Sequence, residues 1–374
     1  MKCDVLVVGA GPAGSMAAKT AAKNFVNVVL IDRNRYIGQP VRCAEGINKF
    51  LFRDTGIKIN DSFIEKKISG TKIYFYDEIY SLDSGQWQGY TINRKIFDLY
   101  LAQQAEQAGA QLLIETNAVG MKRKEKRWIV KTKSTKGLST IEAKIVIGAD
   151  GFECYVGRWT GIRKKWRQDE FSKCYELEIE CPQLKESNIF HIAFGEEFSN
   201  GYAWIFPKCK TANVGVGITP RANAKYALEF FINKYPKISS IIGKNYSIKE
   251  KRGGGIPTTG PRDINELVSD GIILVGDAAG MVDPITGEGI SSSMLSGIAA
   301  GETVASSLKK NKWDKEQLSN YQRIWMNKKY INATLGENFN SLLQFREKFC
   351  NAFSNKKIPK KKRQEIMTAI SNFS

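Results

Sequence analysis

Short apolar runs, separated by a glycine-rich turn and an alanine-rich stretch, organise the first thirty residues. Residues 3–8 are apolar and lead into a turn over 9–14, and residues 26–31 are apolar and end at Asp32. The stretch between them, 15–24, has the small residues of a closely packed helix. Short apolar runs bounded by glycine or an acid are typical of buried parallel strands. We therefore predict a strand–turn–helix–strand unit of about thirty residues.

Two later regions have a different period. Residues 68–90 alternate apolar and polar side chains, and 176–218 contains short runs of the same kind. This alternation is typical of antiparallel strands. The remaining expected elements are a helix over 95–109, strands around 112–115, 128–132 and 143–147, a helix within 222–234, a strand over 271–275, a helix over 289–308 and amphipathic helices over 314–373.

The β-rich regions interrupt the α/β pattern, and 374 residues exceed the usual size of one hydrophobic core. We therefore predict an α/β fold in which a Rossmann-type domain carries an inserted antiparallel-β substrate domain and a C-terminal helical region. The expected boundaries are 1–67, 91–165 and 262–320 for the Rossmann-type domain, 68–90 and 166–261 for the β-rich catalytic domain, and 321–374 for the basic helical region.

A formal net charge of +18 indicates an anionic partner, and it comes from 56 lysines and arginines against 38 acids. The chain has no zinc-finger spacing or RNP aromatic motif, so we expect no nucleic-acid partner. Basic residues gather at 122–126, 164–165 and 356–363. The last run is either a solvated tail or a segment attracted to an anionic membrane surface.

Other features exclude several classes of protein. No apolar run reaches the roughly 18–20 residues that cross a bilayer, and the first thirty residues lack the cleavage site of a signal peptide. Seven scattered cysteines favour a reducing cytoplasm over a disulfide framework. With His191 as the single histidine and no close cysteine pair, we expect no metal site and no Ser-His triad.

The turn after the first apolar run has the glycine spacing of a dinucleotide-binding loop. Gly9 permits a tight turn, Gly11 lets the backbone approach a pyrophosphate, and Gly14 lets the helix pack on the strand. Asp32 stands 18 residues after Gly14, at the distance expected for an acid that accepts from ribose hydroxyls. The cofactor-binding residues predicted here are Gly9, Ala10, Gly11, Pro12, Ala13, Gly14, Asp32 and Arg33.

Two further apolar runs end in an acid beside glycine. One ends in Asp150-Gly151 and the other in Gly276-Asp277. An acid directly after a buried strand lies at the carboxyl edge of the sheet, where open α/β folds bind ligands. These residues are therefore also predicted to contact the cofactor.

The three motifs, in this order, resemble those of the para-hydroxybenzoate hydroxylase-type flavoproteins. The resemblance implies FAD as cofactor, with Asp277 at its ribityl or pyrophosphate region and Asp150 and Gly151 nearby. Arg94, which opens the expected helix over 95–109, matches the arginine that faces the flavin in these proteins.

A finer resemblance is to the geranylgeranyl reductases. It rests on a cysteine loop over 40–46 (Pro-Val-Arg-Cys-Ala-Glu-Gly), a Tyr-Ala-Trp-Ile-Phe-Pro stretch over 202–207, and a loop over 283–290. There is one departure from the family, because the loop reads Cys-Ala-Glu-Gly where two glycines are expected in many members. The resemblance implies flavin contacts by Arg42, Cys43, Ala44, Pro284, Gly287, Gly289 and Ile290.

This resemblance implies an FAD-dependent reductase of isolated C=C bonds in geranylgeranyl chains. Such alkenes have no carbonyl to stabilise negative charge, so hydride from the reduced flavin must arrive together with a proton. Cys43 and Tyr202 are the candidates for the proton-donor region, and Tyr202, Trp204 and Phe206 for the prenyl-binding surface. The implied substrate is a polyprenyl membrane phospholipid precursor. The enzyme is expected to be cytoplasmic and peripheral on the membrane, with ferredoxin, NAD(P)H or a deazaflavin as electron donor.

Other interpretations stay open at this point. Cys43 can instead be a small buried residue, and Tyr202 and Trp204 can be ordinary core. An FAD monooxygenase of an aromatic or terpenoid substrate has the same motifs. A flavin halogenase is disfavoured because its catalytic lysine cannot be placed, and a flavin-containing scaffold without turnover is a further alternative.

Overall fold

The structure is a computed structural model that describes residues 1–82, 88–185, 187–260, 267–327, 347–349, 352–353 and 355–371. The chain divides into two compact units. The first unit consists of Met1–Pro40, Lys95–Trp166 and Pro257–Asn332. The second consists of Val41–Arg94, Arg167–Ile256 and Ala333–Ser374. The α/β fold expected from the sequence is confirmed.

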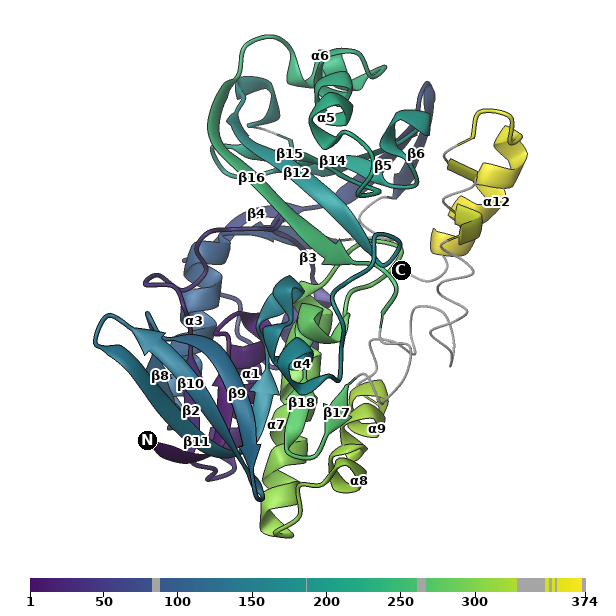
Figure 1. The fold of residues 1–374 in the computed structure, drawn as a ribbon. Helices are drawn as coiled ribbons and strands as arrows, with labels where there is room; N and C mark the ends of the chain where they lie inside the picture. Colours follow the sequence, from purple (N-terminus) through teal and green to yellow (C-terminus); the bar gives the residue numbers. More distant parts are fainter. Residues whose placement is uncertain are drawn as a thin grey trace. The chain divides into compact units, whose positions relative to one another are not determined.

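A mostly parallel sheet forms the centre of the first unit, with strand order β17-β18-β11-β1-β2-β8 and the hairpin partners β9 and β10 beside β11 (Figure 1). Its strands are β1 Lys2–Val8, β2 Val28–Ile31, β8 Gln111–Leu113, β9 Asn117–Lys124, β10 Arg127–Ser134, β11 Gly137–Gly148, β17 Val268–Ser269 and β18 Ile272–Leu274. The helices of this part are α1 Pro12–Lys23, α3 Arg94–Gln107, α4 Tyr155–Thr160, α7 Ile290–Lys309, α8 Lys315–Leu318 and α9 Asn320–Asn327.

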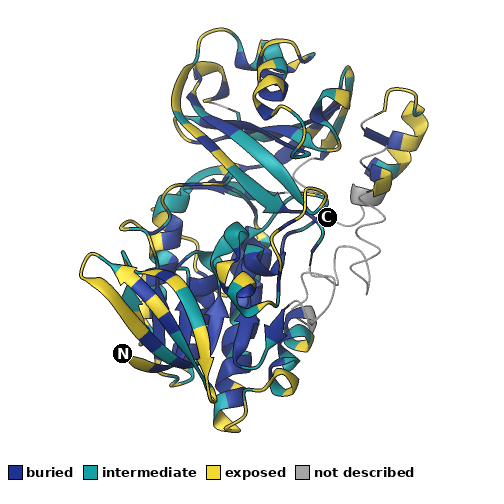
Figure 2. Cartoon of the chain, in the orientation of Figure 1, coloured by how far each residue is buried: buried dark blue, intermediate teal, exposed yellow. Residues whose placement is uncertain are grey.

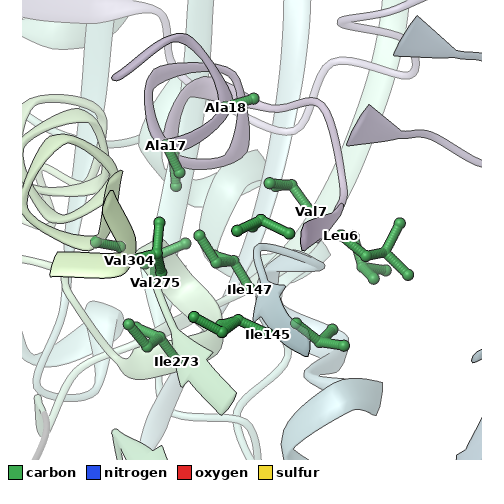
Figure 3. Close-up of a cluster of buried hydrophobic side chains, with 14 of the residues drawn as sticks. Leu6, Val7, Ala17, Ala18, Ile145, Ile147, Ile273, Val275 and Val304 are labelled. Carbon is green, nitrogen blue, oxygen red and sulfur yellow. The ribbon is translucent and has the colours of Figure 1, made fainter. Parts of the chain in front are cut away.

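The core of this sheet is apolar on both faces. Strand β1 pairs in parallel with β11 and with β2, so that Val5 lies opposite both Ile145 and Val28. Figure 3 shows Leu6, Val7 and Ile147 gathered with side chains from α1, β18 and α7. Figure 2 shows the contrast with the β9–β10 hairpin, whose strands carry exposed positions. Burial on both faces explains why β1 and β11 are continuous apolar runs in the sequence.

Helices α1 and α7 pack with their backbones unusually close. A Cβ atom added at Gly297 of α7 would lie 2.1 Å from the carbonyl oxygen of Ala13 in α1, and one added at Gly301 would lie 2.5 Å from Thr20. The small residues of both segments are therefore required by this packing. Helix α1 begins earlier than expected, at Pro12, because proline is favoured in the first helical turn, where its missing N–H costs no hydrogen bond.

A seven-stranded sheet with order β16-β12-β15-β14-β13-β5-β6 forms the second unit, together with a small sheet of order β3-β7-β4. The large sheet is mostly antiparallel, and β5 and β13 pair in parallel. The strands are β3 Gly46–Asn48, β4 Ile64–Ile68, β5 Gly70–Phe75, β6 Glu78–Leu82, β7 Gly89–Ile92, β12 Phe171–Glu180, β13 Ile189–Phe194, β14 Tyr202–Pro207, β15 Ala212–Ile218 and β16 Ser247–Pro257. The helices are α2 Phe50–Thr55, α5 Ala224–Asn233, α6 Ile238–Ile242 and α12 Lys360–Ser371.

The two faces of the large sheet carry different side chains. Leu177, Ile205 and Val214 pack with the apolar residues of α5 and α6 in one buried cluster. Because side chains alternate along a strand, Glu176 and Trp204 point to the opposite face. That face carries the charged and aromatic residues described below.

The described part of the C-terminal region packs on the β5–β6 edge of the same unit. Phe353 and Met367 are buried with Phe75 and Phe194, and the Arg363 guanidinium lies 2.5 Å from a carboxylate oxygen of Glu78. The helices expected over 314–373 are thus present as α8, α9 and α12, with residues 328–346 outside the described part. None of the described helices combines the length and apolar character needed to cross a membrane.

The division into units differs from the expected boundaries at several segments. In the expected C-terminal region, residues 321–327 group with the first unit and residues 355–371 with the second. Residues 41–67 and 91–94, assigned from sequence to the Rossmann-type domain, group with the β-rich unit. The reason is pairing: β3 and β4 both pair with β7, and the Thr91 hydroxyl donates to the carbonyl oxygen of Pro207 at 2.8 Å. Such long-range pairing has no local sequence signal.

Candidate active site

The turn between β1 and α1 has the geometry of a phosphate-binding loop. Gly9 has a φ of 105°, and an added Cβ there would lie 2.3 Å from the carbonyl oxygen of Ala149. An added Cβ at Gly14 would lie 1.8 Å from the carbonyl oxygen of Gly9. Gly11, by contrast, has no atom within 4 Å of the added Cβ. The space beside Gly11 is therefore open at the amino end of α1, where free N–H groups favour an anion.

Asp32 ends β2 directly beside this loop. One carboxylate oxygen accepts from the N–H of Ala10 at 2.8 Å, and the other accepts from the N–H of Asn34 at 2.8 Å. Each oxygen retains a further lone pair for a ligand hydroxyl. Asp32 therefore orients the glycine loop as well as being available to a ribose. Arg33, the next residue, is exposed.

Asp150 follows β11 at the same edge of the sheet. Its Oδ2 accepts from the N–H of Val156 at 2.9 Å, while its buried Oδ1 has no hydrogen-bond partner among the described residues. Burial raises the pKa of Asp150 to about 6, although the Val156 N–H acts in the opposite direction. An acceptor atom held without a partner is suited to a hydroxyl supplied by a ligand. Gly151, next in the chain, has a φ of 69°.

The segment after β18 is built in a similar way. Gly276 has a φ of 60°, and its N–H donates to the Ser296 hydroxyl at 3.0 Å. Farther on, Asp283 accepts from the N–H groups of Ile285 and Thr286 at 2.9 and 2.8 Å, which closes the turn before α7. The predicted residues Asp277, Pro284, Gly287, Gly289 and Ile290 all lie in this segment, and Gly289 is the residue before the first turn of α7.

These segments meet because the strands are parallel. Gly9, Asp32, Asp150 and Asp277 follow β1, β2, β11 and β18, which are neighbours in one sheet and therefore end at one edge. The open space at Gly11, the unpartnered Asp150 oxygen and the α1 amino end fit a dinucleotide with phosphate and ribose groups. The residues of this unit thus fit FAD. Within the described residues, no group of three or more His, Cys, Asp or Glu could hold a metal ion.

The other predicted residues lie in the second unit, beginning with the cysteine loop. The N–H of Glu45 donates to the Cys43 sulfur at 3.2 Å. Burial raises the pKa of the Cys43 thiol, an effect that nearby Arg94 partly opposes. The thiol is therefore protonated at neutral pH. Arg42 is exposed, and Ala44 is partly buried.

A buried network of charged groups surrounds this loop. The Glu45 carboxylate lies 2.7 Å from the Lys208 ammonium and 3.2 Å from the Arg252 guanidinium. Arg252 also pairs with Glu176 at 3.3 Å and contacts Glu178. Burial alone would raise the pKa of Glu45, but the Lys208 charge and hydrogen bond outweigh it and hold that pKa below its usual value.

Glu176 is placed differently from Glu45. Its side chain is buried, and its carboxylate accepts from the indole N–H of Trp204 at 2.9 Å as well as from Arg252. Burial raises the pKa of Glu176 to about 8, although Arg252 favours its ionised form. Burial therefore favours the protonated form of Glu176, whereas Glu45 is held in its ionised form.

Tyr202, Trp204 and Phe206 form a row on one face of β14, as their spacing predicts. The Tyr202 and Trp204 ring centroids are 5.8 Å apart, and those of Trp204 and Phe206 are 6.5 Å apart. The Trp204 indole lies flat on Gly215, where an added Cβ would be 2.4 Å from the ring. Phe206 stacks on Phe190 with centroids 3.9 Å apart.

The predicted site residues thus form two groups, one at the sheet edge of the first unit and one in the second unit. Sequence reasoning missed Glu45, Glu176, Lys208, Asn213 and Arg252. A signal was present for Glu176, because Glu176 and Glu178 alternate with the apolar Leu177 and Ile179 in the sequence, and Glu176, Leu177 and Ile179 are buried in β12. Such acids need partners inside the protein.

Comparison with known proteins agrees with this geometry. Residues 2–324 match the family model described as FAD binding domain, and the chain belongs to this family of flavoproteins. It is 38% identical to digeranylgeranylglycerophospholipid reductase of Methanocaldococcus jannaschii, over 87% of this chain and 83% of that one. It is 35% identical to digeranylgeranylglycerophospholipid reductase 3 of Methanosphaera stadtmanae, over 99% and 91%.

The chain therefore belongs to the digeranylgeranylglycerophospholipid reductase family. Its fold also matches the crystal structure of a geranylgeranyl bacteriochlorophyll reductase-like protein from Thermoplasma acidophilum, with a TM-score of 0.79 and 28% identity over 99% of this chain and 96% of that one. The resemblance to geranylgeranyl reductases and the prediction of FAD as cofactor are confirmed.

Two substitutions in the glycine loop separate its role in FAD binding from its role in folding. Gly11→Ala places its methyl group in open space, so we expect an unchanged melting temperature and FAD binding weakened by about tenfold or more. Gly14→Ala meets the Gly9 carbonyl at 1.8 Å, so we expect loss of folded protein. Thermal unfolding and flavin-fluorescence titration measure both effects. Wild-type FAD affinity in Gly11→Ala would contradict this assignment.

Asp150 generates a pH prediction for the FAD-free protein. Burial raises the pKa of Asp150 in the folded protein to about 6, above the ordinary aspartate value of 3.8, so the stability that its protonated form contributes is present at low pH and is lost as the pH rises through 6. Asp150→Asn should therefore stabilise the FAD-free protein more at about pH 7.5 than at about pH 4.5. Denaturant unfolding at the two pH values, with exposed Asp61→Asn as control, measures this. An equal gain in the free energy of unfolding at the two pH values would contradict the raised pKa of Asp150.

Proposed function

We propose that this protein saturates isolated C=C bonds in the geranylgeranyl chains of a digeranylgeranylglycerophospholipid, with FAD as its redox cofactor. The observation that carries the proposal is 38% identity, over 83% of its length, to a relative named for this activity. The aromatic row of β14 and the protonated thiol of Cys43 support it because they match what this reaction requires. The chemistry that FAD supplies when bound and reduced is transfer of a hydride from its ring.

Reduction of an alkene adds a hydride to one carbon and a proton to the other. An isolated alkene has no carbonyl to hold negative charge, so the proton must arrive together with the hydride. The Cys43 thiol holds its proton at neutral pH and lies in a loop next to a buried network. In this proposal Cys43 and Tyr202 form the proton-donor region, and the alkene is held in place by neighbouring side chains.

The prenyl chain would be bound by the aromatic row. Trp204 is fixed by its hydrogen bond to Glu176 and by contact with Gly215, and Phe206 is fixed by stacking on Phe190. Rigid aromatic rings supply apolar contact area at low cost in conformational entropy. Arg42 and Arg94, which belong to the second unit, are the residues of it that we propose as flavin contacts. After each bond is saturated, an external donor must supply two electrons to reduce the flavin again.

Anaerobic turnover tests the proposal. The FAD-loaded protein is reduced with dithionite, a digeranylgeranylglycerophospholipid is added, and flavin absorbance and lipid mass are followed. We expect flavin reoxidation with a gain of two hydrogens per saturated bond. A flavin that stays reduced until oxygen is admitted, followed by a hydroxylated product, would instead identify a monooxygenase.

Cys43→Ser should lower the turnover number by about tenfold or more, because a serine hydroxyl is a much weaker acid than a thiol. Cys209→Ser is the matched control: Cys209 is an exposed cysteine, and its substitution should leave turnover unchanged. Single-turnover reoxidation of the reduced protein by lipid measures the rate. An unchanged rate in Cys43→Ser would remove Cys43 from the mechanism.

We further propose that the protein works at an anionic membrane surface. Support comes from the basic C-terminal segment, in which Arg363 is bound to Glu78 while five neighbouring lysines are exposed. Each basic residue close to anionic lipid contributes roughly 1 kcal/mol to the free energy of membrane binding. The five lysines are Lys356, Lys357, Lys360, Lys361 and Lys362.

Replacing these five lysines with glutamine should weaken co-sedimentation with phosphatidylglycerol vesicles by about tenfold or more, with little binding to phosphatidylcholine in any variant. The control replaces five exposed lysines elsewhere in the second unit, which are Lys58, Lys67, Lys225, Lys234 and Lys244. Equal loss in both variants would show that net charge, and not this segment, attracts the protein to the membrane.

A further inference from the structure

Glu45 is a large charged residue at a backbone position that favours glycine. Its φ is 66°, in the left-handed region that residues with a side chain seldom adopt. The preceding loop residue Cys43 receives a hydrogen bond from the Glu45 N–H. The φ of Glu45 fixes the angle between the peptide plane that carries this N–H and the Glu45 side chain and carbonyl group. The unusual conformation therefore links the hydrogen bond to the Cys43 thiol to the anchoring of the Glu45 side chain.

The Glu45 carboxylate has a partner on each oxygen. One oxygen accepts from the backbone N–H of Arg94, at the first residue of α3, at 2.8 Å. The other accepts from Lys208 at 2.7 Å, from Asn213 at 2.9 Å and from Arg252 at 3.2 Å. The first contact satisfies an N–H at a helix start that has no partner within the helix. The second oxygen pairs with two buried cations, Lys208 and Arg252.

The backbone of the loop is tied to the same partners. The Asn213 side chain also donates to the carbonyl oxygen of Ala44 at 2.9 Å, and the Ile92 N–H donates to the carbonyl oxygen of Glu45 at 2.9 Å. The loop that bears Cys43 is thus bound to β7, to β15 and to the residue that opens α3. Only 1% of the Glu45 side chain is exposed, so solvent does not compete for these contacts.

We propose that Glu45 is a positioning residue, whose carboxylate holds Cys43 and Arg94 in one fixed geometry through the left-handed turn of the cysteine loop. Where a glycine would adopt this turn without strain, the glutamate adopts it because its carboxylate is bound on both oxygens. The expected effect of Glu45 on the turnover number rests on the proposed function. The expected effect on the accessibility of the Cys43 thiol does not rest on it.

A simpler role must be distinguished from this one. Glu45 could serve only to neutralise Lys208, in which case removing both charges together would restore the protein completely. A positioning role makes a different prediction, because removal of both charges restores folding without restoring the loop. The variants are therefore Glu45→Gly, Lys208→Met and the double variant Glu45→Gly/Lys208→Met.

The first readout is the rate at which N-ethylmaleimide modifies Cys43 in the folded protein, followed by peptide mass spectrometry. Exposed Cys209 is the internal reference. Glu45→Gly should melt at a lower temperature, because Lys208 is left buried without its closest partner. The double variant should regain most of that melting temperature, while Cys43 is modified about tenfold faster than in the wild type relative to Cys209. A wild-type modification rate in the double variant would overturn the proposal.

The second readout is anaerobic turnover of the double variant. The turnover number should fall by about tenfold with KM unchanged, because substrate contacts are retained and the thiol is misplaced. Wild-type turnover in the double variant would also overturn the proposal. If the wild type itself reduces no lipid, the proposed function fails. The Cys43 modification rates then still decide whether Glu45 positions the loop.

Discussion

Parallel pairing of β1 with β11 and β2 is the interaction on which the first unit depends. It requires strands that are apolar on both faces, because crossover helices cover each side of a parallel sheet. It also brings the carboxyl ends of strands that are distant in sequence to one edge. Gly9, Asp32, Asp150 and Asp277 belong to one site for that reason alone. The close approach of α1 to α7 follows from the same layer geometry, and it explains why small residues (glycine, alanine and serine) dominate both helices.

The second unit buries charged groups as well as apolar ones. One face of its large sheet is covered by α5 and α6 and is apolar. The other face buries carboxylates, an ammonium and a guanidinium beside a row of aromatic rings. Ionised groups inside a protein are tolerated only where each is paired and hydrogen-bonded. Lys208 and Arg252 therefore require Glu45, and burial raises the pKa of Glu176 even though Arg252 is next to it. A network of this kind provides rigidity and keeps proton-holding groups near Cys43.

Much of the fold was accessible from local patterns. The βαβ unit, the alternating strands of the second unit, helix α7 and the row formed by Tyr202, Trp204 and Phe206 all followed from periodicity and turn residues, as did the glycine loop. The division into units was less accessible, since residues 41–67 join the β-rich unit through pairing with β7. The role of Glu45 was least accessible. In the sequence it is only a departure from a glycine-rich loop, because its partners Arg94, Lys208, Asn213 and Arg252 lie 49 to 207 positions away.

The sequence by itself determined the class of cofactor, the family and the side chains available for chemistry, because these depend on short motifs whose spacing reflects local backbone geometry. The tertiary structure alone decided which groups are charged and where they are held. Asp150, Glu45 and Glu176 are all carboxylates, yet burial raises the pKa of the first and third while the Lys208 charge lowers that of the second. A pKa depends on solvent exclusion and on neighbours brought from distant parts of the chain, and neither property is written in local sequence.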